Sequence, residues 1–227
     1  MALIEKHPVR QNAAPAAPSA IPIAASAGET TGTAAGGAVQ WGNSAPLALA
    51  AFAVTTFLLS IVNTGIVAKG VEPVVFGVAL TFGGLTQLIA GIIQFRTGKT
   101  FTGVLFSTFG AFWLALWAIV QFYLQDVPKA EVGHALGLLL FAFGGFSAWM
   151  WAASFRTNLV VNVALADLAV TFFVLGIGNY AGISGLVKAG GYLGLMVAAL
   201  AAYLSFAEVC EASYGRAVLP VGPLGKR

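Results

Sequence analysis

The chain is short of charge. Lys, Arg, Asp and Glu together make up 8% of its 227 residues, whereas hydrophobic residues make up 59%. Soluble domains carry about 25% charged residues, so water is the wrong solvent for most of this chain's surface. The composition therefore excludes an ordinary soluble domain and predicts a membrane protein.

Cysteine and histidine are almost as scarce. The single cysteine, Cys210, excludes an internal disulfide, and the two histidines, His7 and His134, belong to no zinc-binding pattern. The apolar stretches hold no Ser–His pair or paired carboxylates, so we expect neither an enzyme nor a cofactor or metal. The net charge of +3 comes without a basic cluster interleaved with aromatic residues, which argues against nucleic-acid binding.

Long apolar runs are abundant. Six of them approach the roughly 20 residues that a helix needs to cross a bilayer. The alternating polarity of a membrane β-barrel is absent, so we predict an all-α polytopic membrane protein whose short connections make neighbouring helices antiparallel. The six predicted transmembrane helices are 47–68, 74–95, 101–124, 135–155, 159–177 and 186–209.

The basic residues favour one orientation. Eight of the eleven Lys and Arg residues fall on one side of the predicted spans, which places the N- and C-termini in the cytoplasm. We expect a multi-pass protein of the plasma membrane, a bacterial inner membrane. Residues 1–42, rich in Ala, Pro and Gly, are predicted to be a disordered cytoplasmic tail. Residues 43–212 form the six-helix pore domain, and residues 213–227 form a short cytoplasmic tail.

Several polar side chains interrupt the apolar runs. Thr56 and Asn63 share one face of the first predicted helix, and Gln87 lies on one face of the second. Such stripes are typical of helix–helix contacts, but they also suit a narrow pore lined by neutral hydrogen-bonding groups. In the pore interpretation, Asn179 and Lys188 belong to the outer vestibule of the substrate pathway.

Charge inside the spans limits what can pass. No Lys or Arg lies well within a span, so a bare anion would find no fixed cation, and neutral solutes or protonated weak acids fit best. Asp167, in the fifth span, costs about 2.5–3.5 kcal/mol to insert, and we treat it as a proton-linked candidate. A structural hydrogen bond to a neighbouring helix is the alternative. Glu208 and Glu211 lie near the predicted cytoplasmic surface, where charge is tolerated, and we assign them no role.

A family resemblance runs through most of the chain. Residues 43–49, Asn-Ser-Ala-Pro-Leu-Ala-Leu, resemble the Asn-Pro-Ala-Pro-Leu-Gly-Leu signature of the acetate uptake transporter family, which includes the bacterial succinate–acetate permeases. Further matches follow in family order to about residue 222. They include Gly83-Gly84-Leu85-Thr86-Gln87, Phe109-Gly110-Ala111-Phe112-Trp113 and Tyr214-Gly215-Arg216-Ala217-Val218-Leu219-Pro220.

The resemblance implies a urea-channel-like protomer of six helices, assembled as a homo-hexamer with a pore in each subunit. It also implies an apolar constriction at the positions of Phe52, Phe109 and Leu168. Phe109 stands where the family usually has Tyr, and Gln94 where many members have Glu. Asp167 directly precedes the constriction residue Leu168.

Residues and resemblance together predict a channel or transporter for acetate and similar small carboxylates, including succinate. Thr56, Asn63 and Gln87 would exchange hydrogen bonds with the solute. A channel and a proton symporter both fit this pattern. A channel for a neutral solute such as urea or ammonia, and a non-transporting membrane sensor, are the alternative functions.

Overall fold

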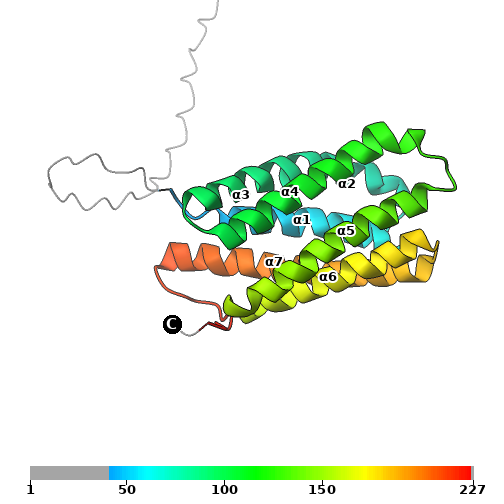
Figure 1. The fold of residues 1–227 in the computed structure, drawn as a ribbon. Coiled ribbons are helices and arrows are strands. Elements are labelled where there is room, and N and C mark those ends of the chain that lie inside the picture. The colour runs from blue at the N-terminus through cyan, green and yellow to red at the C-terminus, as the bar shows by residue number, and fades with distance from the viewer. Residues whose placement is uncertain (1–40, 226–227) are drawn as a thin grey trace, which may run out of the picture. The chain divides into compact units, whose positions relative to one another are not determined.

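The computed structural model describes residues 41–225, which form an antiparallel bundle of six long helical segments (Figure 1). All six are long and apolar enough to cross a membrane, as the sequence predicts. The α-helices are α1 (Ala45–Thr64), α2 (Glu72–Val78), α3 (Gln87–Arg96), α4 (Thr100–Ala118), α5 (Val132–Ala153), α6 (Leu159–Tyr180) and α7 (Ser184–Tyr214).

The second segment is not one uniform helix. A 3₁₀ turn (Lys69–Val71) leads into α2, and a π-helical stretch (Ala79–Thr86) joins α2 to α3. A π-helical stretch, with hydrogen bonds from residue i to i+5, is wider than an α-helix and is rare. Here it contains Gly83, where an added Cβ would come within 2.7 Å of the Thr55 hydroxyl oxygen in α1. The irregular stretch therefore lies where the second segment packs tightly against the first.

Shorter irregular turns extend two other segments. A π-helical turn (Ile119–Tyr123) and a 3₁₀ turn (Leu124–Asp126) continue α4, and a 3₁₀ turn (Ser154–Arg156) follows α5. The third and fourth segments consequently reach 100–126 and 132–156, close to the predicted 101–124 and 135–155.

Two predicted helix ends are wrong. The first helix ends at Thr64 rather than at residue 68, because Gly65 adopts a left-handed conformation (φ +78°) that terminates it. The last helix runs on to Tyr214 rather than stopping at residue 209. Charged side chains such as Glu208 and Glu211 end an apolar run, but they do not interrupt the backbone hydrogen bonds of a helix.

Glycines let α7 lie close to α1 and α6. A Cβ at Gly191 would come within 2.5 Å of the Thr64 backbone nitrogen, and one at Gly190 within 2.5 Å of Leu175 in α6. The hydrophobic effect does not drive helices together in lipid, so their association depends on close packing, which small residues at the contact allow. The contacts of α7 with α1 and α6 are therefore set by these glycines.

The segment after α7 folds back on the bundle. The backbone N–H of Leu159 donates to Gly222 O (2.6 Å), and that of Leu224 donates to Thr157 O (3.0 Å). The first N–H groups of a helix have no partner within it, so this segment satisfies a donor at the start of α6. Residues 213–225, predicted as part of a tail, thus begin inside α7 and end against α6.

Of the tail predicted for residues 1–42, residues 1–40 lie outside the part of the chain that the structure describes.

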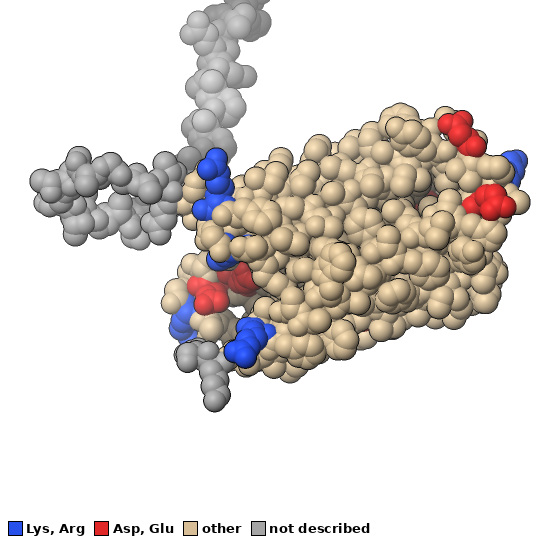
Figure 2. Space-filling model, viewed as in Figure 1, with Lys and Arg blue, Asp and Glu red and all other residues tan. Residues whose placement is uncertain are grey.

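Charged side chains gather at the two ends of the bundle and leave a broad apolar belt between them on the face seen in Figure 2. Leu47, Phe57, Ile89 and Phe206, for example, are at least 47% exposed. An apolar belt of this kind suits the hydrocarbon of a bilayer, which requires helical backbone to satisfy its own hydrogen bonds. We call the end where α1 begins and α7 ends the terminal end, and the opposite one the far end.

Candidate functional site

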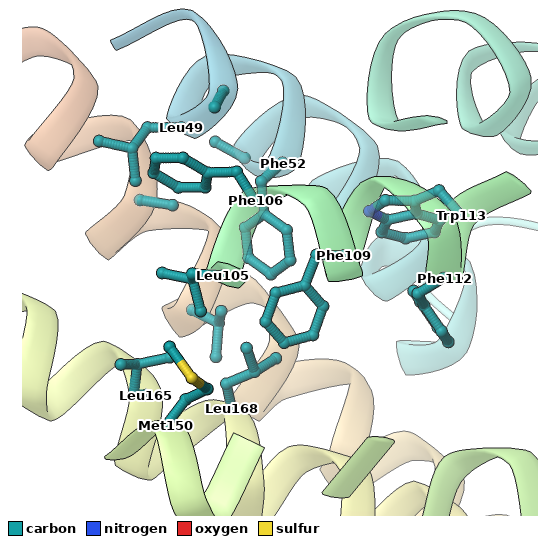
Figure 3. Packing of buried hydrophobic residues seen from close by; sticks show 14 of the residues in the cluster. Leu49, Phe52, Leu105, Phe106, Phe109, Phe112, Trp113, Met150, Leu165 and Leu168 are labelled. Atoms are coloured by element: carbon teal, nitrogen blue, oxygen red, sulfur yellow. The ribbon is translucent and has the colours of Figure 1, made fainter. Parts of the chain in front are cut away.

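Three buried apolar side chains meet at the centre of the bundle: Phe52 from α1, Phe109 from α4 and Leu168 from α6, the predicted constriction. Each is at most 8% exposed, and the rings of Phe52 and Phe109 lie 5.4 Å apart between centroids. Figure 3 shows the three side chains pointing toward one another. The fold therefore brings together three residues that are far apart in sequence, at the positions implied by the family resemblance.

More aromatic rings hold Phe109 in place. Its ring meets that of Phe146 edge-on at 5.4 Å and stacks on that of Phe172 at 6.1 Å. Offset and edge-on ring pairs of this kind are the favoured geometries. The constriction is thus the middle of a larger aromatic cluster and not an isolated contact.

Two small cavities end at this constriction, one on each side. The apolar cavity, of about 70 Å³, lies toward the terminal end, and the hydroxyl cavity, of about 40 Å³, lies toward the far end. Their linings have two residues in common, Phe52 and Leu168. The two cavities therefore meet at these two side chains.

The hydroxyl cavity takes its name from Thr56, Ser60 and Thr171, which line it together with Asn63 and Trp113. Within residues 41–225, three buried polar atoms here have no hydrogen-bond partner: Thr56 Oγ1, Thr171 Oγ1 and Trp113 Nε1. A buried polar atom without a partner is costly, and such atoms call for an explanation. Hydroxyl groups and an indole N–H can all donate to a carboxyl or carbonyl oxygen.

The apolar cavity has a different lining. Aliphatic and aromatic side chains dominate, and the polar members are Gln87, Thr102 and Glu208. Gln87 is 1% exposed, and its Oε1 lacks a partner among the described residues. The Gln87 amide oxygen is therefore available to a solute in this cavity.

A wider vestibule of about 490 Å³ opens at the terminal end. Its lining shares Leu204 and Glu208 with the apolar cavity. The vestibule, the apolar cavity and the hydroxyl cavity therefore follow one another, each joined to the next by two shared residues. This row is the candidate pathway.

A polar network braces the vestibule side of the pathway. Asn43 Nδ2 donates to Glu208 (2.9 Å), and Asn43 Oδ1 accepts from Lys99 Nζ (3.2 Å). The Gln94 amide is best satisfied when its oxygen accepts from the backbone N–H of Ala45 (3.1 Å) and its nitrogen meets Thr102 Oγ1 (2.8 Å). Gln94, in α3, thereby ties α4 to the first turn of α1, whose Ala45 N–H also donates to Asn43 Oδ1 (3.1 Å).

The remaining predicted residues lie apart from the row of cavities. Asn179 is not among the lining residues, and its Nδ2 donates to Leu175 O in its own helix (2.8 Å). Lys188 lies against Gly65 at the far end. Asp167 is 8% exposed in the middle of α6, next to Leu168, and its Oδ2 has no partner in the described part of the chain.

Sequence reasoning missed one charged residue of the pathway. The spacing along the third predicted helix already places Trp113 on a common side with Phe106 and Phe109. Glu208 looked unremarkable because it lies near the end of an apolar run. Only the packing of α7 against the neighbouring helices shows that it borders two cavities.

A bundle of helices long and apolar enough to cross a membrane, with a row of cavities along it, has the architecture of a channel or transporter. Among the described residues, no group of three His, Cys, Asp or Glu side chains could hold a metal ion. Comparison with known proteins agrees with this class. Residues 28–226 match the GPR1/FUN34/yaaH family, and the chain belongs to this family.

Three relatives illustrate the membership. The succinate-acetate/proton symporter SatP of Escherichia coli K12 is 34% identical over 189 residues, which cover 82% of this chain and 98% of the relative. The ammonia transport outward protein 2 of Saccharomyces cerevisiae is 37% identical, over 75% of this chain and 62% of the relative. The structure of the bacterial acetate channel SatP superposes with a TM-score of 0.75 at 33% identity, over 81% of this chain and 100% of that one.

Proposed function

We propose that this protein passes acetate and similar small carboxylates, including succinate, across the plasma membrane along the row of cavities. The observation that carries the proposal is that the apolar and hydroxyl cavities end on the same pair of side chains, Phe52 and Leu168. Relatives named as a succinate-acetate/proton symporter and as an acetate channel support the choice of solute.

The lining favours passage of the protonated acid. A bare carboxylate in dry surroundings meets an idealised cost of about 20 kcal/mol, and neither cavity beside the constriction has Lys, Arg or His in its lining. The hydroxyls of Thr56 and Thr171 and the amide of Gln87 replace part of the solute's hydration. Phe52, Phe109 and Leu168 then exclude water and hydrated ions.

Asp167 is the group we propose to take up or hand over the proton. Among residues 41–225 it is the one carboxyl in the middle of a span, adjacent in sequence to Leu168 and one helical turn from Thr171. A carboxyl with an unpartnered oxygen in this position can accept a proton without breaking an existing hydrogen bond.

Labelled acetate uptake into liposomes that contain the purified protein tests the proposal, with and without an inward proton gradient. We expect protein-dependent uptake. Accumulation above the level set by passive diffusion of acetic acid identifies a proton-coupled transporter, and rapid equilibration without accumulation identifies a channel. Absence of protein-dependent acetate flux would refute the proposed function and leave the sensor alternative.

A neutral solute such as ammonia or urea is the second candidate. Two observations favour it: one relative is named as an ammonia transport protein, and Phe109 offers no hydroxyl group at the constriction. Competition of acetate uptake by each solute separates the two candidates. Acetate uptake that ammonia or urea blocks completely would favour the neutral solute.

We also propose that both termini lie in the cytoplasm, because Arg96, Lys99, Arg156 and Arg216 all lie toward the terminal end. Labelling of a cysteine introduced in the α3–α4 connection (residues 97–99) tests the orientation. The family resemblance further suggests a homo-hexamer, which native mass spectrometry of the purified protein would test.

A further inference from the structure

Glu208 occupies a junction in the pathway. Leu204 and Glu208 are the two residues that line both the vestibule and the apolar cavity. They are four residues apart in α7 and therefore lie on one face of that helix. A solute that moves between the vestibule and the apolar cavity must pass these two side chains, and only one of them is polar.

The carboxylate of Glu208 is held without an ion pair. It accepts a hydrogen bond from Asn43 Nδ2 (2.9 Å), and no Lys or Arg nitrogen of residues 41–225 lies within 4.0 Å of it. Lys99 instead donates to the opposite side of the same amide, at Asn43 Oδ1 (3.2 Å). The amide fixes the position of the carboxylate, and Lys99 acts on it across the amide and not in direct contact.

The surroundings add a further negative charge. The charged residues that line the vestibule are Lys99, Glu208 and Glu211, while α1 and α6 contribute no charged group there. The vestibule lining thus carries one net negative charge when these groups are ionised. The narrow cavity beyond it has Glu208 as its one charged lining residue. An anion that approaches this junction meets a like charge in a partly desolvated setting.

A protonated carboxylic acid meets a different situation at the same point. Its O–H can donate a hydrogen bond to a Glu208 oxygen, and charge-assisted hydrogen bonds of this kind are stronger than neutral ones. The neutral acid is attracted where the anion is repelled. This contrast does not require movement of any helix.

We propose that Glu208 is a specificity-determining residue of the pathway, whose carboxylate admits the protonated acid to the apolar cavity and turns back the carboxylate anion. The inference rests on the proposed function, because it concerns the protonation state of the solute that this function passes. It assigns the discrimination to the junction between vestibule and cavity, separate from the constriction at Phe52, Phe109 and Leu168.

Glu208→Gln tests the proposal, with Glu211→Gln as the matched control. Gln has nearly the same shape as Glu and keeps an oxygen that can accept the hydrogen bond from Asn43. Glu211 lies one helical turn from Glu208 and lines the vestibule but not the apolar cavity. Voltage-driven acetate flux is measured in liposomes at pH 7.5, where carboxylic acids are almost fully ionised. We expect Glu208→Gln to raise anion flux about tenfold, and Glu211→Gln to change it by less than about twofold.

Glu208→Asp separates charge from shape, and we expect it to keep the low anion flux of the unmodified protein. Anion flux that stays unchanged in Glu208→Gln would overturn the inference, and so would an equal rise in Glu211→Gln or Glu208→Asp. Because each variant is compared with the unmodified protein, a protein that carries no acetate at all would refute the proposed function instead.

Discussion

The two cavities beside the constriction differ more in chemistry than in size. The apolar cavity is lined mainly by aliphatic and aromatic side chains, and its one carboxylate stands where it opens to the vestibule. The hydroxyl cavity collects Thr56, Ser60 and Thr171, and several polar atoms in it lack partners among the described residues. The hydroxyl cavity can hydrogen-bond a dehydrated carboxyl group through several side chains, whereas the apolar cavity offers it mainly Gln87 and, at its mouth, Glu208. The pathway is therefore asymmetric about the constriction.

The largest expected effect comes from forcing α7 away from α1, beside the hydroxyl cavity. Gly191→Val would place side-chain atoms within 2.5 Å of the Thr64 nitrogen and 2.8 Å of the Asn63 carbonyl carbon, where only backbone could yield. Overpacking typically costs about 1–3 kcal/mol, and more where backbone must move. We expect little folded protein in detergent by size-exclusion chromatography. Gly185→Val, at an open position in the same helix, should yield folded protein.

The next effect comes from joining the two cavities. Phe52→Ala removes one of the two side chains they share, so acetate flux in liposomes should rise about tenfold, which corresponds to about 1.4 kcal/mol off the barrier. Larger carboxylates should also pass. Phe57→Ala, a change on the exposed side of α1, serves as the control. Flux equal to that of the control would argue against a constriction at Phe52.

Asp167→Asn tests whether the proton enters beside the constriction. We expect acetate uptake that no longer responds to an inward proton gradient, so the several-fold effect of the gradient on uptake is lost. For comparison, general acid–base groups contribute about 10²-fold or more to the rates of enzymes. The measurement is the ratio of acetate uptake with and without the gradient. An unchanged ratio would reduce Asp167 to a structural role.

A smaller change sharpens the comparison between the cavities. Thr56→Val keeps the side-chain shape and removes an unpartnered hydroxyl from the hydroxyl cavity, so acetate uptake should fall about threefold, within the usual worth of one hydrogen bond. Thr55→Val is the control, because its hydroxyl bonds Ala51 O in its own helix and lines neither cavity. Equal losses in both variants would contradict a solute-binding role for Thr56.

The smallest expected effect is at Phe109. Phe109→Tyr adds a hydroxyl group at the constriction, and we expect the ratio of acetate flux to ammonia flux to rise about twofold. This rise is smaller than the effect of one complete hydrogen bond between the hydroxyl group and acetate. The measurement is the uptake of each labelled or pH-reported solute by the same liposomes. A fall in this ratio would show that the added hydroxyl hinders acetate.

Sequence reasoning predicted the spans well and the site in part. Apolar runs of about 20 residues identify helices in lipid almost without ambiguity, because the backbone must satisfy its own hydrogen bonds there. The end at Thr64 was missed because Val62 to Ala68 still reads as largely apolar, although Gly65 can terminate a helix. The stripe that holds Thr56 and Asn63 was recognised from its spacing, and both residues line the hydroxyl cavity.

The sequence by itself determined that the protein lies in a membrane, how many helices cross it and which family it belongs to. These properties follow from local composition and from motifs that are contiguous in the sequence. Tertiary structure alone decided which residues face one another. Phe52, Phe109 and Leu168 come from three helices, and the two cavities that Glu208 borders are walled by several more. Contacts of this kind depend on how closely glycines let helices approach, and this distance is a property of pairs of helices rather than of any single segment.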